Sequence, residues 1–196
     1  MTTAIQSLTE IADGYDAIVL DQWGVLHNGS TPYPGVADAL KSITAAGHRL
    51  AILSNSGKRA DPNADRIRQM GFASGLFTTV MTAGEALWHD VKTGSVPHRS
   101  FHVIESRQGD ATRWAEGLDI GMGCDIRTAD AVLLMGLPDD TTLMPWQPVL
   151  DAAGDRNLTV YCSNPDHIAP RAGGRTVLSP GALAREYEQL GGDVVY

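Results

Sequence analysis

Two polar side chains follow apolar runs at places where a side chain can act on a ligand. Asp21 follows the run Ala17–Leu20, and Ser54 follows the run at 50–53. Ligands of an open α/β sheet bind beyond the carboxyl ends of its strands, so a carboxylate there can serve as a nucleophile and a hydroxyl can donate a hydrogen bond. Taken singly, each residue is more often a turn or helix-cap residue. The assignment therefore depends on the pair.

The two runs are typical of buried parallel strands joined by a helix. Neither run alternates with polar residues, which is the pattern of parallel strands covered on both faces. Between them, Val36, Leu40 and Ile43 recur at spacings of four and three residues, which places them on one helical face. The pattern predicts a βαβ unit in which Asp21 and Ser54 end adjacent strands.

The rest of the chain continues as α/β structure. A helix is expected at 61–70 and a short strand at 76–81, and we place a domain boundary near residue 81. A second set of elements follows, with helices expected at 83–91, 111–116, 146–153 and 180–190, and strands at 101–104, 131–135, 158–161 and, as a beginning only, 193–196.

Composition excludes several classes of partner. The 196 residues carry a net charge of -8 without any run of Lys or Arg, which argues against nucleic acid and against an anionic membrane surface. No stretch approaches the roughly 18 consecutive apolar residues of a membrane span. Cys124 and Cys162 lack the spacing of a disulfide framework or a zinc site. These features predict a cytoplasmic protein without nucleic-acid or membrane partners.

The order and spacing of the motifs resemble a known family. In chain order the motifs are Asp21, Gly24-Val25-Leu26, Asn28-Gly29, Pro34-Gly35, Ile52-Leu53-Ser54-Asn55-Ser56 and Ser163-Asn164-Pro165-Asp166. This set is similar to class IIA hydrolases of the haloacid dehalogenase superfamily, the group with p-nitrophenyl, phosphoglycolate and pyridoxal phosphate phosphatases. The resemblance implies an α/β fold: a Rossmann-like parallel-sheet core at 1–81, incomplete in this chain, an inserted α/β cap at 82–175, and a return to the core at 176–196 that ends at the start of a strand.

The resemblance also implies a reaction. Asp21 would be the nucleophile of a hydrolase for small phosphorylated metabolites and would form an aspartyl-phosphate. Preorganised donors would stabilise the phosphoryl oxygens. The implied substrate- or phosphate-binding residues are Gln22, Trp23, Ser54, Asn55, Asn164 and Asp166. A homo-oligomer is compatible with the resemblance.

Two departures from the family pattern lower the expected activity. Trp23 occupies the position of the Asp that protonates the leaving group, and a proton-transfer group of that kind contributes about 10² to 10⁴-fold in rate. The family's phosphate-binding Lys and acidic magnesium ligands are expected beyond Tyr196, so the chain looks C-terminally truncated. Asp21 and the backbone carbonyl of Trp23 alone predict weak or absent Mg²⁺ binding.

Two other functions remain open alongside a weak or inactive phosphatase. An enzyme of the same fold that cleaves a carbon–halogen or carbon–phosphorus bond would also lack an Asp at position 23. A non-catalytic ligand-binding or interaction protein is consistent with both departures.

Overall fold

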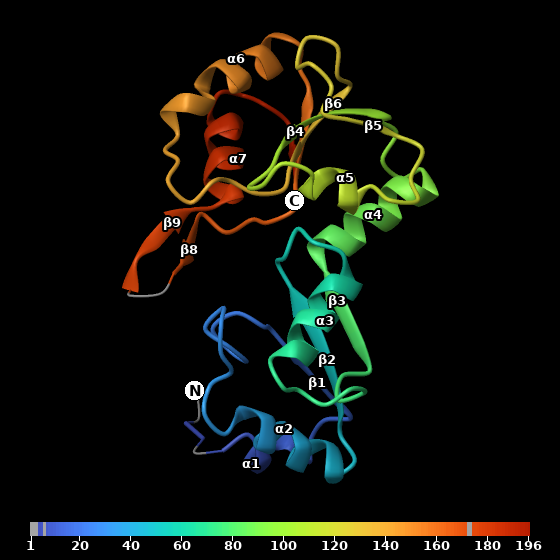
Figure 1. Cartoon of the computed structure of the whole chain (residues 1–196), viewed down its shortest axis with the longest axis vertical. Coiled ribbons are helices and arrows are strands. Elements are labelled where there is room, and N and C mark those ends of the chain that lie inside the picture. Colours follow the sequence, from blue (N-terminus) through green and yellow to red (C-terminus); the bar gives the residue numbers. More distant parts are fainter. Residues whose placement is uncertain (1–3, 6, 172–173) are drawn as a thin grey trace. The chain divides into compact units, whose positions relative to one another are not determined.

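The computed structural model describes residues 4–5, 7–171 and 174–196. The chain forms two compact units, whose elements are labelled in Figure 1. The first unit comprises Met1–Ser54 and Ala60–Met81, and the second comprises Asn55–Arg59 and Thr82–Tyr196.

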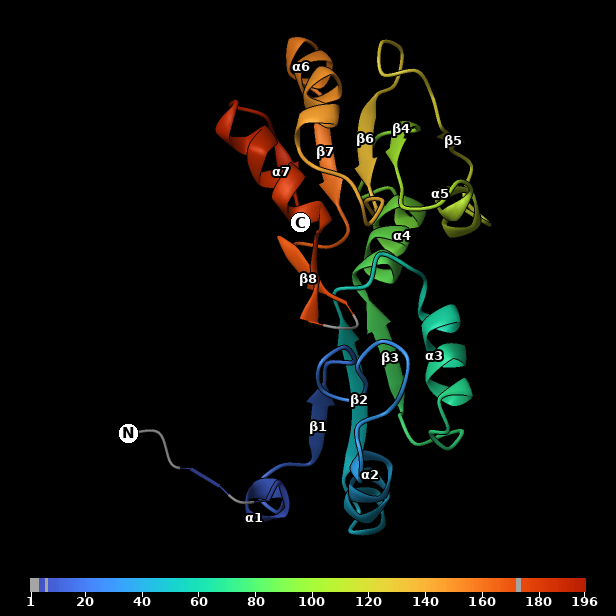
Figure 2. The same ribbon diagram turned by 60° about the vertical axis from the view of Figure 1, so that its left-hand side comes forward.

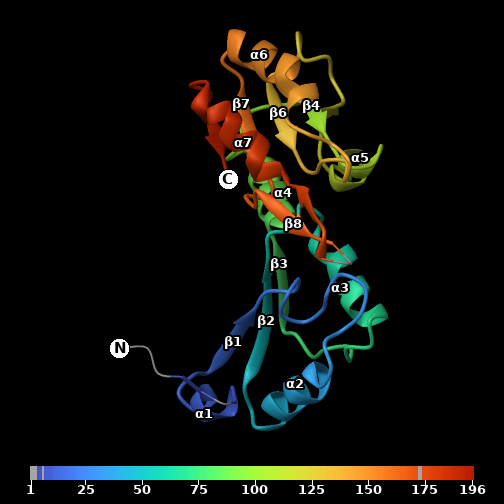
Figure 3. The same cartoon turned by 90° about the vertical axis from the view of Figure 1, so that its left-hand side faces the viewer.

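The first unit contains a three-stranded sheet. Its elements are α1 (Thr9–Ala12), β1 (Ala17–Leu20), α2 (Val36–Ala45), β2 (Arg49–Ser54), α3 (Ala60–Gln69) and β3 (Thr79–Thr82). The strand order is β1-β2-β3, so β2 lies in the middle (Figure 3). β1 and β2 are parallel, with Leu20 opposite Ile52. The predicted βαβ unit is therefore confirmed.

One face of this sheet carries the core of the first unit. Leu40 and Ile43 of α2 and Ile67 of α3 pack with Leu50 and Ile52 of β2 in one hydrophobic cluster. These apolar positions recur along each helix and alternate along the strand, so a single face of each element is buried.

The other face of the sheet differs from the sequence-based expectation. Val19 of β1 is 61% exposed and Leu53 of β2 is 58% exposed. The prediction that these strands are covered on both faces is therefore wrong for the described residues, because the α2 and α3 side chains pack only on the face that carries Leu50 and Ile52.

The second unit contains a five-stranded parallel sheet of order β10-β7-β6-β4-β5. Its elements are α4 (Ala83–Thr93), β4 (Ser100–Ile104), α5 (Asp110–Trp114), β5 (Gly121–Met122), β6 (Ala131–Leu134), the 3₁₀ turn η1 (Met144–Trp146), α6 (Gln147–Asp155), β7 (Thr159–Cys162), β8 (Ile168–Pro170), β9 (Thr176–Leu178), α7 (Pro180–Gln189) and β10 (Val194–Val195). β8 and β9 form a separate antiparallel hairpin.

Helices cover both faces of the five-stranded sheet. Leu150 of α6 and Leu183 of α7 pack on one face together with Leu134 of β6. Val91 of α4 and Trp114 of α5 contribute to a second cluster on the other face. Figure 2 shows α6 and α7 on one side of the strands and α5 on the other. This two-sided cover explains why β6, in the middle of the sheet, is buried at every position.

Residues 176–196 belong to the second unit, and their assignment as a return to the core stays a prediction. β10 pairs with β7, with Val194 opposite Val160. In α7, Leu183 and Tyr187 belong to the second unit's core, and the Tyr187 hydroxyl donates a 2.8 Å hydrogen bond to the Leu158 carbonyl. The apolar stripe of α7 is therefore satisfied within the second unit. The assignment of residues 82–175 as a cap stays a prediction.

Both cysteines are free thiols. Cys162 is buried, and burial raises the pKa of its thiol to about 11, so it carries no thiolate at neutral pH. Among the described residues, no helix combines the length and the apolar character that a membrane crossing requires.

The central strand of the second unit provides a test of the fold. Leu133 of β6 is fully buried, so Leu133→Ala is expected to lower the free energy of unfolding by about 2–5 kcal/mol through lost burial and a residual cavity. Urea denaturation measures the change. Leu190→Ala is the matched control, because that side chain is 54% exposed, and its effect should stay below about 1 kcal/mol. Equal effects of the two variants would contradict the described core.

Candidate active site

Asp21 and Ser54 lie at the same edge of the first sheet. Asp21 directly follows β1, Ser54 is the last residue of β2, and these two parallel strands are paired without an intervening strand. Asp21 is exposed, and its Oδ1 accepts a 2.7 Å hydrogen bond from the backbone N–H of Gln22. The carboxylate is thus accessible and is held by its neighbour. Its catalytic role stays a prediction.

The loop after Asp21 folds back on itself. The Gln22 carbonyl accepts the backbone N–H groups of Val25, Leu26 and His27, at 3.3, 2.8 and 3.3 Å. The Gly24 N–H donates to the His27 carbonyl at 2.9 Å, with Gly24 at a φ of 85°. Gln22 is only 3% exposed, so its side chain is part of the interior of this loop. The backbone N–H of Gln22 donates to Asp21, so this group is already hydrogen-bonded within the loop.

The Trp23 ring packs against His27, Arg66 and Gly29. Its ring meets the His27 ring edge-on at 5.9 Å, and the Arg66 guanidinium lies over it at 5.5 Å. A Cβ at Gly29 would come within 2.5 Å of the Trp23 ring, so only glycine allows this approach. Arg66 Nη2 also donates to the Gly29 carbonyl at 2.5 Å. The Trp23 indole is therefore held in place by packing and by a cation–π contact with Arg66.

His27 is a buried neutral histidine beside these residues. It is 1% exposed, and its Nδ1 accepts the Gly29 N–H at 3.0 Å, which places the ring proton on Nε2. Burial, reinforced by the Arg66 cation and opposed by the Asp21 carboxylate, lowers the pKa of His27. Among the described residues, His27 Nε2 and Gln22 Nε2 are buried without a hydrogen-bond partner.

Three further predicted site residues come together in the second unit. Asn55 Nδ2 donates to Asp166 Oδ1 at 3.2 Å, across 111 positions of sequence. Asn164 Oδ1 accepts the Asp166 N–H at 3.0 Å, and the Gly181 N–H donates to the Asp166 carbonyl at 3.0 Å. The structure thus joins Asn55, Asn164 and Asp166 in one polar group, while Asp21, Gln22, Trp23 and Ser54 belong to the first unit.

The described residues around Asp21 offer few ligands for a divalent metal ion. Within the described part of the chain, no group of three or more His, Cys, Asp or Glu side chains is arranged to hold a metal. Asp21 offers one carboxylate, one oxygen of which already accepts from Gln22, and a hard cation takes six or more oxygens. The described residues therefore offer no three-ligand side-chain site for magnesium.

Sequence reasoning missed the side chains that fix these loops. His27 and Arg66 hold the Trp23 loop, and Arg59 with Glu85 anchors the segment after Ser54. Arg59 stands in the same stretch as the Ser54 motif, so its position was a usable signal. Nothing local indicates that Arg66 of α3 reaches Gly29, because that contact spans 37 residues.

The sequence pattern that defines the haloacid dehalogenase-like hydrolases matches residues 18–116, about half of the chain, and this stretch includes most of β1 together with Asp21 and Ser54. The chain belongs to this family. The predicted family is therefore confirmed.

Individual haloacid dehalogenase-like proteins support the assignment. Glycerol-3-phosphate phosphatase of Homo sapiens is 40% identical over 195 residues, and that of Rattus norvegicus is 25% identical over 201 residues. Each match includes 88% of this chain and 61% of the relative, so the chain spans about three fifths of these relatives. A haloacid dehalogenase-like hydrolase from Brucella suis is 29% identical, with a TM-score of 0.86 over 98% of this chain and 72% of that structure. The predicted α/β fold class is confirmed.

The environment of His27 predicts a pH dependence of stability. The folded state keeps the ring neutral where the unfolded chain begins to protonate it, so the free energy of unfolding should fall as pH drops below about 6.5. Urea midpoints between pH 8 and pH 5 measure this. His27→Asn removes this titration, so its midpoint should fall less over the same range. Parallel curves for the two proteins would show that His27 is not held neutral.

Two glycines of the loop form a matched pair for testing the Trp23 contact. Both have positive φ, but a Cβ at Gly29 meets the Trp23 ring, whereas a Cβ at Gly24 meets nothing within 4 Å. Gly24→Ala should show only the cost of the backbone conformation, about 1–2 kcal/mol. Gly29→Ala should lower the free energy of unfolding by about 1–3 kcal/mol more than Gly24→Ala does, because the added methyl group overpacks the Trp23 ring. Urea unfolding compares them, and equal losses would remove the argument for a packed Trp23.

Proposed function

We propose that this chain carries the nucleophile of a hydrolase for small phosphorylated metabolites. The observation that carries the proposal is the placement of Asp21 and Ser54 at the ends of adjacent parallel strands in a haloacid dehalogenase-like hydrolase. Relatives named glycerol-3-phosphate phosphatase support a phosphate ester as the substrate. The role of residues 82–175 as a cap is part of the same proposal and rests on the family resemblance.

The proposed reaction has two steps at phosphorus. An Asp21 carboxylate oxygen attacks the phosphorus atom, the ester P–O bond breaks, and the alcohol leaves as an alkoxide with the electron pair of that bond. Water then attacks the phosphorus of the aspartyl-phosphate, which releases inorganic phosphate and regenerates the carboxylate. The Ser54 hydroxyl donates a hydrogen bond to a phosphoryl oxygen and so opposes the growing negative charge.

Trp23 determines which esters this chain can cleave. The indole N–H is too weak an acid to protonate a leaving alkoxide, and the ring is engaged with His27 and Arg66. A leaving group that is stable as an anion, such as nitrophenolate, needs no proton donor. The alkoxide that leaves an alkyl phosphate does need one. We therefore infer slow turnover of alkyl phosphates and faster turnover of activated aryl phosphates.

Magnesium is the cofactor that the family leads one to expect. It would neutralise phosphoryl charge, with the Asp21 carboxylate and the Trp23 carbonyl as its ligands from this chain. Since the described residues supply too few oxygens, we propose weak or absent Mg²⁺ binding by this chain.

Hydrolysis of 4-nitrophenyl phosphate in the presence of Mg²⁺ tests the proposal. Asp21→Asn should lower kcat/KM by roughly 10³-fold or more, because it removes the group that forms the covalent intermediate. Asp16→Asn, just before β1, is the control and should leave the rate within about twofold. Unchanged activity in Asp21→Asn would refute the nucleophile.

Product analysis separates the alternatives. The packed Trp23 favours one of them, an enzyme that cleaves a carbon–halogen or carbon–phosphorus bond, since such a reaction needs no protonated alkoxide. Release of halide, or of phosphate from a phosphonate, without ester hydrolysis would select it.

A further inference from the structure

A cavity of about 660 Å³ lies in the second unit, between the end of α4 and the segment that leads into β5. Its lining includes three apolar and three charged side chains, which are Val91, Leu118, Ile120, Lys92, Arg99 and Asp119. All of them belong to the second unit, so the cavity needs no part of the first. Sites for small molecules have volumes of about 300–1,000 Å³ and pair an apolar lining with a few polar groups. The size and the lining of this cavity fit that description.

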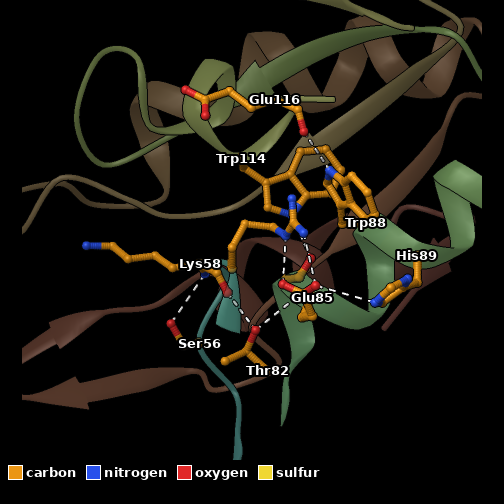
Figure 4. A network of polar contacts seen from close by, with 10 residues as sticks. Ser56, Lys58, Thr82, Glu85, Trp88, His89, Trp114 and Glu116 are labelled. Atoms are coloured by element: carbon orange, nitrogen blue, oxygen red, sulfur yellow. Dashed lines mark hydrogen bonds and ion pairs between the residues drawn. The ribbon is translucent and has the colours of Figure 1, made fainter. Parts of the chain in front are cut away.

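Two side chains of α4 hold the segment that forms one wall of the cavity, residues 118–121. Trp88 Nε1 donates to the Glu116 carbonyl at 3.1 Å (Figure 4), and Lys92 Nζ donates to the Gly117 carbonyl at 2.7 Å. Gly117 has a φ of 82°, and a Cβ there would come within 3.5 Å of the Trp88 ring. The start of the wall is therefore attached to α4 by two side-chain hydrogen bonds and by close packing.

Trp88 is itself fixed by a charged pair on α4. The Arg59 guanidinium lies 3.8 Å from the centre of the Trp88 ring. Arg59 Nε and Nη2 donate to the two Glu85 carboxylate oxygens at 2.7 and 3.0 Å, and the two side chains are 24% and 13% exposed. The Glu85 N–H donates to Thr82 Oγ1 at 3.0 Å, which caps the helix (Figure 4). The ring that holds Glu116 is thus in place before any ligand arrives, which keeps the ordering cost of binding low.

The apolar floor of the cavity, formed by Val91, Leu118 and Ile120, belongs to the core of the second unit. Val91 is 3% exposed, and Leu118 and Ile120 are partly buried. All three pack in the cluster on the α4 and α5 face of the sheet. Side chains in a closely packed cluster have little room to fill the cavity themselves. An apolar group of a ligand would therefore gain free energy by leaving water at this floor.

Arg99 brings hydrogen-bond donors to the cavity. Its Nη1 donates to the backbone carbonyls of Val96 and His98, both at 3.1 Å, which orients the guanidinium. Among the described residues, no hydrogen bond or ion pair uses Arg99 Nε or Nη2. Two adjacent guanidinium nitrogens match the two oxygens of a carboxylate. Lys92 adds a second positive charge and keeps two of its three donor protons after its bond to Gly117.

The charges of the lining favour a ligand with one negative charge. Lys92 and Arg99 carry two positive charges and Asp119 carries one negative charge, so one positive charge is left over. Within the part of the chain that the structure describes, Asp119 forms no ion pair that would neutralise it. A monoanion balances the lining, whereas a second negative charge on the ligand would be repelled by Asp119.

We propose that this cavity binds a small amphiphilic monoanion, a carboxylate attached to an apolar or aromatic group. The carboxylate pairs with Arg99 and Lys92, the apolar group lies on the apolar floor, and Asp119 opposes dianions such as phosphate monoesters. The site goes beyond the proposed hydrolysis and does not depend on Asp21.

NMR titration of the full chain with 3-phenylpropionate tests the site without any need for turnover. Amides of residues 91–92, 99 and 118–121 should shift in a saturable manner, with a Kd on the order of 1 mM for a ligand of this size. Acetate lacks the apolar group and 3-phenylpropanol lacks the charge, so each should bind about tenfold more weakly or worse. Equal affinities for the three compounds, or no saturable shift at these amides, would overturn the site.

Single substitutions separate the site from a general effect of charge. Arg99→Gln should weaken 3-phenylpropionate binding about tenfold, because it removes the bidentate donor. Arg185→Gln is the matched control, since Arg185 is exposed on α7, which packs on the other face of the sheet. It removes the same charge and should leave the Kd within about twofold. Equal weakening by the two substitutions would refute the role of Arg99.

Removal of the carboxylate gives a test in the opposite direction. Asp119→Asn should tighten 3-phenylpropionate binding about threefold, because it leaves the two positive charges unopposed. Phenyl phosphate, largely a dianion at neutral pH, should shift the amides of residues 118–121 in this variant and not in the unchanged protein. A misfolded variant cannot produce such a gain. Weaker binding of 3-phenylpropionate in Asp119→Asn would contradict the charge balance and overturn the proposal.

Discussion

The parallel pairing of β1 with β2 is the constraint on which the candidate chemistry depends. Because the two strands run in the same direction and are direct neighbours, the residues that follow them emerge at one edge of the sheet. A carboxylate and a hydroxyl from positions 21 and 54 are thereby brought to the same edge of the sheet. The apolar packing of α2 and α3 on Leu50 and Ile52 stabilises this pairing.

The loop after Asp21 shows how local packing and reactivity compete for the same residues. Trp23 fills a position where the family resemblance predicts an acid. Gly29 leaves room for its ring, the Arg66 guanidinium lies over the ring, and burial lowers the pKa of His27 beside it. Among the described residues, His27 Nε2 and Gln22 Nε2 are buried without partners. Such groups destabilise a folded protein unless another interaction offsets them.

Sequence patterns predicted the helices, the strands and the family. They did not predict the side-chain contacts between the helices and strands. Apolar runs located β1, β2, β6 and β7, and helical spacing located α2 and α7, because these signals are local. The partners of Arg66 and Arg59, which are Gly29 and Glu85, could not be predicted, since a long charged side chain reaches several neighbours and only the fold selects one.

Arg66 also affects what an acid introduced at position 23 could do. Its guanidinium lies over the present indole and donates to the Gly29 carbonyl, so a carboxylate introduced there would have a cation as its neighbour. An adjacent positive charge lowers the pKa of a carboxyl group, which would leave the new residue ionised and without a proton to transfer. A carboxyl group at position 23 would therefore keep a proton only if the charge of Arg66 in α3 were removed as well.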